Sequence, residues 1–220
     1  RAGRPGGLPP DPPPSRRQPA LVTESLRLRP LTEHDGRFLR ALYLDREVTR
    51  FLQDGPYGWW RGRRMAGLTL RHGLQQLRIS GYGPLVMERH GASRAVGLIG
   101  LSKIPILGAE RVELSYMLVP SEWGQGLAVE AGRAVLEDAF GRLGLRQVWA
   151  TCRQENARSL RVLQRLGFET TAMIAADREA VAEALPVFVL AQASAGGDYR
   201  LPGPEGGRQA TSTSTPAPRQ

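Results

Sequence analysis

The pattern of apolar and polar residues divides the chain into a patterned centre and two unpatterned ends. In residues 25–29 polar and apolar residues alternate with a period of two, as in a half-buried β-strand, and Pro30 closes the run. The same reasoning predicts further strands at 85–87, 95–101, 112–119, 148–152, 169–175 and 187–193. Gly91 stands at the turn between the strands at 85–87 and 95–101. Together they predict a mixed, mostly antiparallel sheet of about six to seven strands.

Apolar residues at helical spacing predict the helices of the chain. Residues 126–142 carry the clearest apolar stripe. In residues 156–166 a second stripe ends at Gly167, which an apolar residue follows, and this is the pattern of a Schellman ending. Two further helical patterns, one capped by Thr32 and one ending near Gly81, bring the expected number of helices to about four.

The two ends of the chain lack such a pattern. Residues 1–20 hold seven of the 17 prolines and almost no large apolar residue, and residues 194–220 consist mainly of Gly, Pro, Ser, Thr and Gln. Neither composition buries enough apolar surface to offset the entropy that ordering costs. We therefore expect a single α/β (α+β) domain at 21–193, between a Pro/Arg-rich and a Gly/Pro/Ser/Thr-rich disordered tail.

Composition and charge argue against several classes of protein. The longest weakly charged stretch, 95–109, falls short of the ~20 apolar residues of a membrane span, and no apolar signal-peptide segment follows the first basic residues. We therefore expect a soluble cytoplasmic protein without a membrane partner. Cys152 is the single cysteine, so neither an internal disulfide nor a thiolate metal cage is expected. The formal net charge is +9, but only Lys103 among the 30 basic residues is a lysine. Because such an arginine bias is typical of GC-rich coding sequences, we discount nucleic acid as a partner.

A glycine-rich turn at residues 123–128, Trp-Gly-Gln-Gly-Leu-Ala, is the main candidate for chemistry. It joins a predicted strand to the start of the clearest helix, where unpaired backbone N–H groups and the helix dipole favour an anion. Its glycines allow a sharp turn and let a phosphate approach the backbone closely. No Lys-Ser or Lys-Thr pair follows, so a P-loop is not expected, and the spacing differs from the GxGxxG of a dinucleotide fold. Taken alone, the turn is equally compatible with a loop that only bends sharply.

The turn and its surroundings resemble the GNAT superfamily of N-acetyltransferases. In that family an Arg or Gln, two residues, Gly, one residue and Gly or Ala form the loop that binds the diphosphate of acyl-CoA. Gly126 and Ala128 match the last two fixed positions, and Trp123 stands where the Arg or Gln would be. This departure resembles the branch of the ribosomal-protein N-terminal (alanine/serine) acetyltransferases. The resemblance covers nearly all of 21–193 and is weakest at 55–83, a region that helps to shape the acceptor pocket in this superfamily.

The resemblance implies a single-domain GNAT fold. It also implies direct transfer of an acetyl group from acetyl-CoA to a primary amine, without a metal. The acetyl-CoA site is then expected at the fourth strand of the fold, the turn and the start of the downstream helix, with these residues: Met117, Leu118, Val119, Trp123, Gly124, Gln125, Gly126, Leu127, Ala128, Asn156 and Ser159.

Two polar side chains are the candidates for catalysis. Glu113 lies at a point of the fourth strand where the family often has a glutamate. A carboxylate there is able to accept the proton that an ammonium group loses before it attacks, and the alternative is a solvated strand carboxylate. Ser159 corresponds to a serine that related enzymes hold near the thioester sulfur, although it also suits a bond to the start of its helix. Because Leu163 stands where many of these enzymes have a tyrosine acid, Ser159 is the remaining candidate. Asn156 suits a helix N-cap, a role compatible with a contact to the pantetheine arm.

Other residues carry weaker signals. Cys152 is expected to be a buried filler residue and not a nucleophile. Trp59 and Trp60 suit a stacking platform, but an aromatic core beside a solvated basic face is the more common explanation. Residues 55–87 hold five arginines and no acidic residue. If this segment lines the acceptor side, an acceptor with negative charge near its amine is favoured.

The acceptor and the assembly stay open on the sequence. The acceptor is a peptide or protein N-terminus, or a small amine such as an antibiotic or a polyamine. A catalytically silent acyl-CoA-binding or RNA-associated module is the alternative from a different class. A monomer and a homodimer are both compatible with the sequence.

Overall fold

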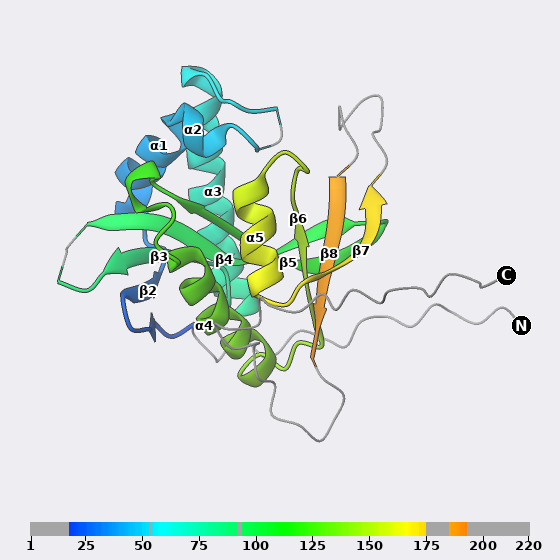
Figure 1. The fold of residues 1–220 in the computed structure, drawn as a ribbon. Coiled ribbons are helices and arrows are strands. Elements are labelled where there is room, and N and C mark those ends of the chain that lie inside the picture. Colours follow the sequence, from blue (N-terminus) through cyan, green and yellow to red (C-terminus); the bar gives the residue numbers. More distant parts are fainter. Residues whose placement is uncertain (1–17, 53, 92–93, 175–184, 193–220) are drawn as a thin grey trace, which may run out of the picture.

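The computed structural model describes residues 18–52, 54–91, 94–174 and 185–192. They form one central sheet with helices on its two faces (Figure 1). The strands are β1 (Leu21–Val22), β2 (Leu26–Pro30), β3 (Pro84–Arg89), β4 (Ala95–Ile106), β5 (Ala109–Leu118), β6 (Gln147–Thr151), β7 (Glu169–Ile174) and β8 (Leu185–Ala191). The helices are α1 (Gly36–Leu44), α2 (Arg46–Thr49), α3 (Trp59–Ser80), α4 (Leu127–Gly141) and α5 (Ala157–Arg165), with short 3-10 helices η1 (Glu33–Asp35) and η2 (Pro120–Glu122). In the described ranges, no helix is both long and apolar enough to cross a lipid bilayer.

The sheet has eight strands in the order β1-β2-β3-β4-β5-β6-β8-β7. All neighbouring strands are antiparallel except β5 and β6, which are parallel. A parallel pair needs a crossover connection, and α4 provides it. The predicted α/β class and the mixed, mostly antiparallel sheet are confirmed. The predicted number of strands was too low, because the two-residue β1 is too short to produce an alternating pattern.

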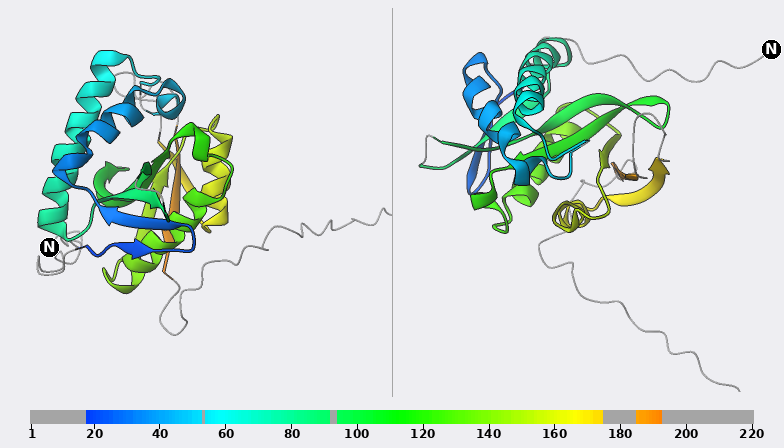
Figure 2. Two further views of the ribbon diagram at one scale, coloured as in Figure 1. Left: turned by 90° about the vertical axis from the view of Figure 1, so that its left-hand side faces the viewer. Right: turned by 90° about the horizontal axis from the view of Figure 1, so that it is seen from above.

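Helices cover the two faces of the sheet (Figure 2). α4 and α5 pack on one face, in a core that includes Leu85 and Ile99. α1 and α3 pack on the opposite face, in a core that includes Val86 and Leu98. Because successive residues of a strand point to opposite faces, neighbours such as Leu85 and Val86 enter different cores. Whether a strand residue belongs to one core or the other therefore follows from its odd or even position along the strand.

The two helix ends that the sequence indicated are present. Helix α5 ends in a Schellman motif, since Phe168 N–H donates to the Leu163 carbonyl and Gly167 N–H to the Gln164 carbonyl, both at 3.0 Å. Gly167 has a φ of 83°, a left-handed value that favours glycine. Gly81, with a φ of 70°, ends α3 in the same conformation.

The predicted domain boundaries are only partly open to comparison. Gln18 lies inside the predicted tail 1–20, yet it is buried and its Oε1 accepts the Gly83 N–H at 2.8 Å. The folded unit therefore begins at least three residues before the predicted position 21. The rest of that tail, the tail 194–220 and the residue 193 that closes the predicted domain lie outside the described residues.

The core role considered for the two neighbouring tryptophans is wrong. Trp59 and Trp60 begin α3 with 53% and 80% of their surface exposed. Small residues fill the inward face of this helix, and a Cβ added at Gly62 would lie 2.6 Å from the Tyr43 carbonyl oxygen. The fully buried positions of α3 are therefore held by small residues, and the two tryptophans lie outside the core.

Candidate active site

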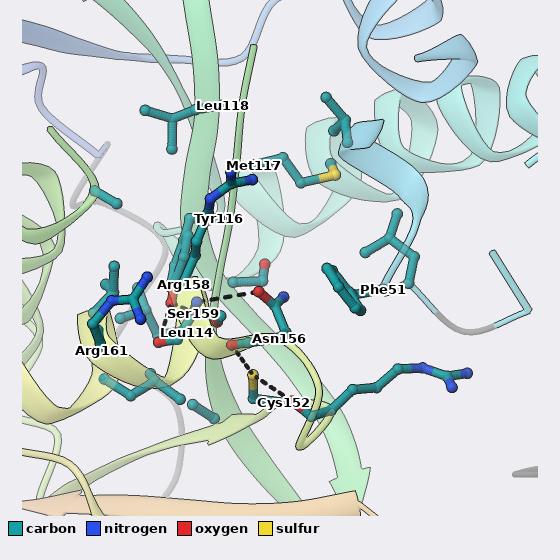
Figure 3. Close-up of a pocket in the computed structure, with 18 of the residues that line it drawn as sticks. Phe51, Leu114, Tyr116, Met117, Leu118, Cys152, Asn156, Arg158, Ser159 and Arg161 are labelled. Atoms are coloured by element: carbon teal, nitrogen blue, oxygen red, sulfur yellow. Dashed lines mark hydrogen bonds between the residues drawn. The ribbon is translucent and has the colours of Figure 1, made fainter. Parts of the chain in front are cut away.

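A cavity lies where two neighbouring strands separate. β5 and β6 share a single register pair, Glu113 with Trp149. Beyond this pair, residues 114–118 of β5 continue beside β4, while the chain after β6 leads into α5. The space between them is a cavity of about 680 Å³, within the range of small-molecule sites. α2, the turn at 123–126 and α5 complete its walls, and Figure 3 shows the side chains that line it.

The turn at 123–126 has the geometry of an anion site. Gly124 and Gly126 have φ values of 78° and 79°, in the left-handed region. An added Cβ would meet nothing within 4 Å at either glycine, so the backbone angle and not space calls for glycine. Gly126 is the N-cap of α4, and its carbonyl accepts the N–H groups of Val129 and Glu130 at 3.0 Å. Because the first N–H groups of a helix have no partner within the helix, this turn presents donors to an anion.

Trp123, at the position of the family's Arg or Gln, is held from two sides. Its indole Nε1 donates to the Leu118 carbonyl at 2.9 Å, and the Arg158 guanidinium carbon lies 4.6 Å from its ring centroid. Arg158, Arg161 and Arg165 all come from α5 and line the cavity. Residues spaced by three and four positions share one face of a helix. These arginines were not among the predicted site residues. Their spacing, next to a glycine-rich turn, was the signal in the sequence that indicates them.

Glu113 lies at the narrow end of the cavity, where the two strands still pair. The Thr151 hydroxyl donates to Glu113 Oε1 at 2.6 Å. The carboxyl group is half-buried rather than solvated. Burial raises the pKa of Glu113 above its usual range, and the hydrogen bonds from Thr151 offset part of that rise. Such a carboxylate accepts protons more readily at neutral pH than an exposed one does.

Strand β5 presents its side chains alternately to the two faces of the sheet. Leu114, Tyr116 and Leu118 belong to the core of α4 and α5. Met117 packs against the core of α1 and α3. The alternation places Glu113 on the same face as Met117. Glu113 and Tyr116 therefore approach the cavity from opposite faces of one strand.

Tyr116 makes a contact that the sequence analysis missed. Its hydroxyl lies 2.8 Å from Ser159 Oγ and 3.3 Å from the Ser159 carbonyl oxygen (Figure 3). Burial raises the pKa of Tyr116 well above its usual range, and the hydrogen bond with Ser159 offsets only part of the rise, so the phenol stays protonated. A tyrosine hydroxyl is thus present in the cavity although Leu163 stands at the expected position. The alternation of side chains along β5 was the signal in the sequence for this contact, because it puts Tyr116 on the side of α5.

Asn156 and Cys152 lie close together in the same cavity (Figure 3). Asn156 Oδ1 accepts the Ser159 N–H at 3.2 Å, which confirms the predicted N-cap. The Cys152 thiol is buried and donates to the Arg153 carbonyl at 3.4 Å. Burial raises the pKa of this thiol, and a protonated thiol is a poor nucleophile. The predicted burial of Cys152 is confirmed.

The structure brings most of the predicted site residues to this cavity. Those that line it are Glu113, Met117, Leu118, Trp123, Gly124, Gly126, Leu127, Ala128, Asn156 and Ser159.

Two predicted site residues lie outside the lining. The Val119 N–H donates to the Val96 carbonyl at 2.9 Å, so this amide is already used within the fold. The Gln125 side chain turns away, since its Nε2 donates to the Ser121 carbonyl at 3.1 Å and its Oε1 accepts from Arg89.

The arginines of residues 55–87 do not line the cavity either. They lie on exposed positions of α3, whose inward face packs on α1. An acceptor with negative charge near its amine was favoured only if residues 55–87 line the acceptor side. That premise is wrong, because α2 and the turn after it, and not α3, form the wall near Glu113. Among the described residues, no group of three His, Cys, Asp or Glu side chains is placed to hold a metal ion.

Known proteins share both the sequence pattern and the fold. Residues 25–169 match the family described as acetyltransferase (GNAT) domain. The chain is 26% identical to the uncharacterized N-acetyltransferase YoaA of Bacillus subtilis (strain 168) over 162 residues, 69% of this chain and 83% of that protein. It is 26% identical to the spermidine N(1)-acetyltransferase of Escherichia coli (strain K12) over 144 residues, 66% of this chain and 73% of that protein. Its fold is similar to that of Mycobacterium smegmatis RimJ in complex with CoA-disulfide, with a TM-score of 0.62 and 20% identity, covering 76% of this chain and 81% of that one.

Proposed function

The chain belongs to the acetyltransferase (GNAT) family, and on that premise we propose that it transfers an acetyl group from acetyl-CoA directly to a primary amine. One observation carries this proposal: β5 and β6 part after the Glu113–Trp149 pair, so that a carboxylate and a pair of hydroxyls approach one cavity from opposite faces of the sheet. A thioester held between the strands is then open to an amine from the Glu113 face. Holding both reactants in one cavity supplies much of the rate acceleration.

The turn and α5 suit the anionic part of acetyl-CoA. The diphosphate of coenzyme A needs backbone donors that lie close to it, and the turn around Gly124 and Gly126 offers them at the positive end of α4. Arg158, Arg161 and Arg165 add positive charge beside that turn. The RimJ structure of similar fold is a complex with CoA-disulfide, which supports coenzyme A as the ligand.

Glu113 is the proposed general base. An amine is protonated at neutral pH, so the ammonium group first gives one proton to the Glu113 carboxylate. The nitrogen lone pair then attacks the thioester carbonyl carbon, and the C–N bond forms. The second nitrogen proton leaves to solvent as the amide forms.

Tyr116 and Ser159 are the proposed acid pair. When the C–S bond breaks, the electron pair stays on sulfur, and the Tyr116 hydroxyl donates its proton to the thiolate. The Ser159 hydroxyl, 2.8 Å away, orients the phenol and stabilises its anion until water returns a proton. Because a thiolate is a good leaving group, we expect this step to contribute less than the base.

For the branch of the family and the acceptor we propose two candidates. The Trp123-Gly124-Gln125-Gly126 turn supports the branch of ribosomal-protein N-terminal acetyltransferases, whose acceptor is a protein N-terminus. A small-molecule acetyltransferase is the second candidate, which the relative that acetylates spermidine supports.

Release of coenzyme A tests the proposed function. The full chain is mixed with acetyl-CoA and a panel of peptides, polyamines and aminoglycosides, free thiol is followed over time, and products are identified by mass spectrometry. We expect an acetylated amine in the same amount as the released thiol. Binding of acetyl-CoA without any acetylated product would contradict the proposal and favour a silent acyl-CoA-binding module.

A further inference from the structure

An apolar wall borders the cavity on the Glu113 face. It consists of Val48, Phe51, Leu52, Ile104 and Leu185, all of which line the cavity. These residues come from α2, the turn after it, β4 and β8. Figure 3 shows Phe51 across the cavity from Asn156 and Cys152. If acetyl-CoA enters from the turn at 123–126, as proposed above, this wall faces the acceptor.

The apolar wall is held in place before any acceptor arrives. Val48 and Leu52 pack against the core of α1 and α3. Thr49 between them is fully buried, and its hydroxyl donates to the Asp45 carbonyl at 2.9 Å and accepts the Tyr57 N–H at 3.1 Å. The Gly55 N–H donates to the Leu52 carbonyl at 2.9 Å. Because these bonds fix the backbone on both sides of Phe51, its ring is a preformed part of the cavity.

The charges beside the wall are of both signs and do not form an acidic site for a polycation. The Arg50 guanidinium carbon lies 5.3 Å from the centroid of the Phe51 ring, and Arg153 also lines the cavity. Two carboxylates also line this part of the cavity: Asp54, which is paired with Arg61 at 2.5 Å, and Glu47, which is exposed to solvent. A second ammonium group placed against the apolar wall would lose water without a carboxylate from the wall itself, and an unpaired charge there is costly.

We propose that the acceptor is a primary amine joined by a short link to an uncharged apolar group, and that Phe51 and its neighbours in the apolar wall receive that group. The amine then reaches Glu113 while its apolar part leaves water. The same chemistry is offered by a free alkyl or arylalkyl amine and by a peptide N-terminus with a large apolar first side chain. This inference rests on the proposed acetyl transfer and names its substrate class.

A matched pair of amines tests the substrate class. Hexylamine and 1,6-diaminohexane have the same carbon chain and differ in one terminal ammonium group. With saturating acetyl-CoA and the full chain, we expect kcat/KM for hexylamine to exceed that for the diamine by about tenfold or more. Phenethylamine and a pair of peptides that begin with Phe or Gly distinguish the two sources of the apolar amine. Equal or faster turnover of the diamine or of spermidine would overturn the inference.

Variants of the apolar wall connect the preference to Phe51. Phe51→Ala should lower kcat/KM for hexylamine about tenfold, mainly through KM, and that for the diamine by much less, while Phe51→Leu should keep most of the preference. Trp60→Ala, an exposed aromatic residue outside the cavity, is the control and should change neither. An equal loss of kcat/KM with both amines in Phe51→Ala would mean that the ring acts only on the fold. The thermal midpoint of unfolding should then fall as well.

A binding experiment separates a failure of the proposed acetyl transfer from a failure of the proposed apolar acceptor site. If no amine is acetylated, the proposed function fails, and calorimetry with coenzyme A present then compares hexylamine with the diamine directly. Tighter binding of hexylamine that Phe51→Ala abolishes would still support the apolar acceptor site. Equal or absent binding of both amines would overturn it.

Discussion

The hydroxyl of Tyr116 on β5 lies 2.8 Å from that of Ser159 on α5, although 43 positions separate the two residues in the chain. The contact joins a strand and a helix from the two sides of the cavity. It also places a protonated phenol where the sequence offered only a serine. The roles proposed for this pair, for Glu113 and for the turn are each open to a separate measurement.

The hydroxyl pair should act as one unit. Tyr116→Phe and Ser159→Ala should each lower kcat by no more than about tenfold, or ~1.4 kcal/mol, because a thiolate needs little help to leave. The double variant should lose little more than Tyr116→Phe alone, since the two groups share one hydrogen bond. Tyr43→Phe is the matched control, because the Tyr43 hydroxyl lies 2.8 Å from Thr69 Oγ1, and neither residue lines the cavity. Additive losses in the double variant would contradict a shared role.

Glu113→Gln should produce a chemical defect without a structural one. It keeps the shape of the side chain and removes the base, so kcat/KM should fall by about 10²- to 10⁴-fold while acetyl-CoA affinity stays near wild type. The defect should shrink as the pH approaches the pKa of the acceptor, because more of the amine then arrives unprotonated. Glu110→Gln on the same strand, outside the cavity lining, is the control. Full activity of Glu113→Gln across the pH range would assign the base to another group.

The acid limb of the pH profile should respond to Thr151. Glu113 must be ionised to accept a proton, so kcat/KM should fall as the pH drops through its raised pKa. The hydrogen bonds from Thr151 lower that pKa, so Thr151→Val, which removes the hydroxyl bond, should move the acid limb to higher pH. Thr69→Val removes a comparable hydroxyl away from the cavity and should leave the limb in place. A shift to lower pH in Thr151→Val would contradict this sign.

Gly126→Asp should weaken acetyl-CoA binding severely. The substitution adds a negative charge and side-chain bulk at the N-cap of α4, where the diphosphate is proposed to bind. Gly91→Asp is a matched control, because Gly91 also has a left-handed φ, 75°, and open space around it, yet it does not line the cavity. Both variants bear the same kind of backbone strain, so calorimetry isolates the effect on the anion site. An affinity in Gly126→Asp equal to that in Gly91→Asp would refute this site.

Arg158→Ala should have a smaller effect on the same affinity. The Arg158 side chain is exposed, and an exposed charge pair is worth about 0.2–1 kcal/mol. The acetyl-CoA dissociation constant should therefore rise by no more than about fivefold, and less so at high salt. Arg40→Ala, which removes an exposed arginine of α1 outside the cavity, should leave the constant unchanged.

Features that depend on neighbouring residues in the chain were determined by the sequence itself. The Asn156 cap, the Schellman ending at Gly167 and the glycine turn before α4 were all predicted, and each is made of contacts within one turn of backbone. The alternation of the strands likewise predicted the class of the sheet. Local hydrogen bonds and side-chain periodicity act over a few residues, so a single sequence is enough to identify them.

The composition of the cavity was decided only by the tertiary structure. The parity of β5 assigns Tyr116 to a face, but its partner Ser159 follows from the crossover of α4, which brings α5 beside that face. Phe51 has the helical spacing of a core residue, and it becomes a cavity wall only because β5 and β6 part opposite α2. Trp59 and Trp60 lie on the exposed side of α3, while Gly62 makes the close contact of this helix with Tyr43 of α1. In each case the deciding contact joins distant segments, and its formation depends on the packing of the whole domain and on no local pattern.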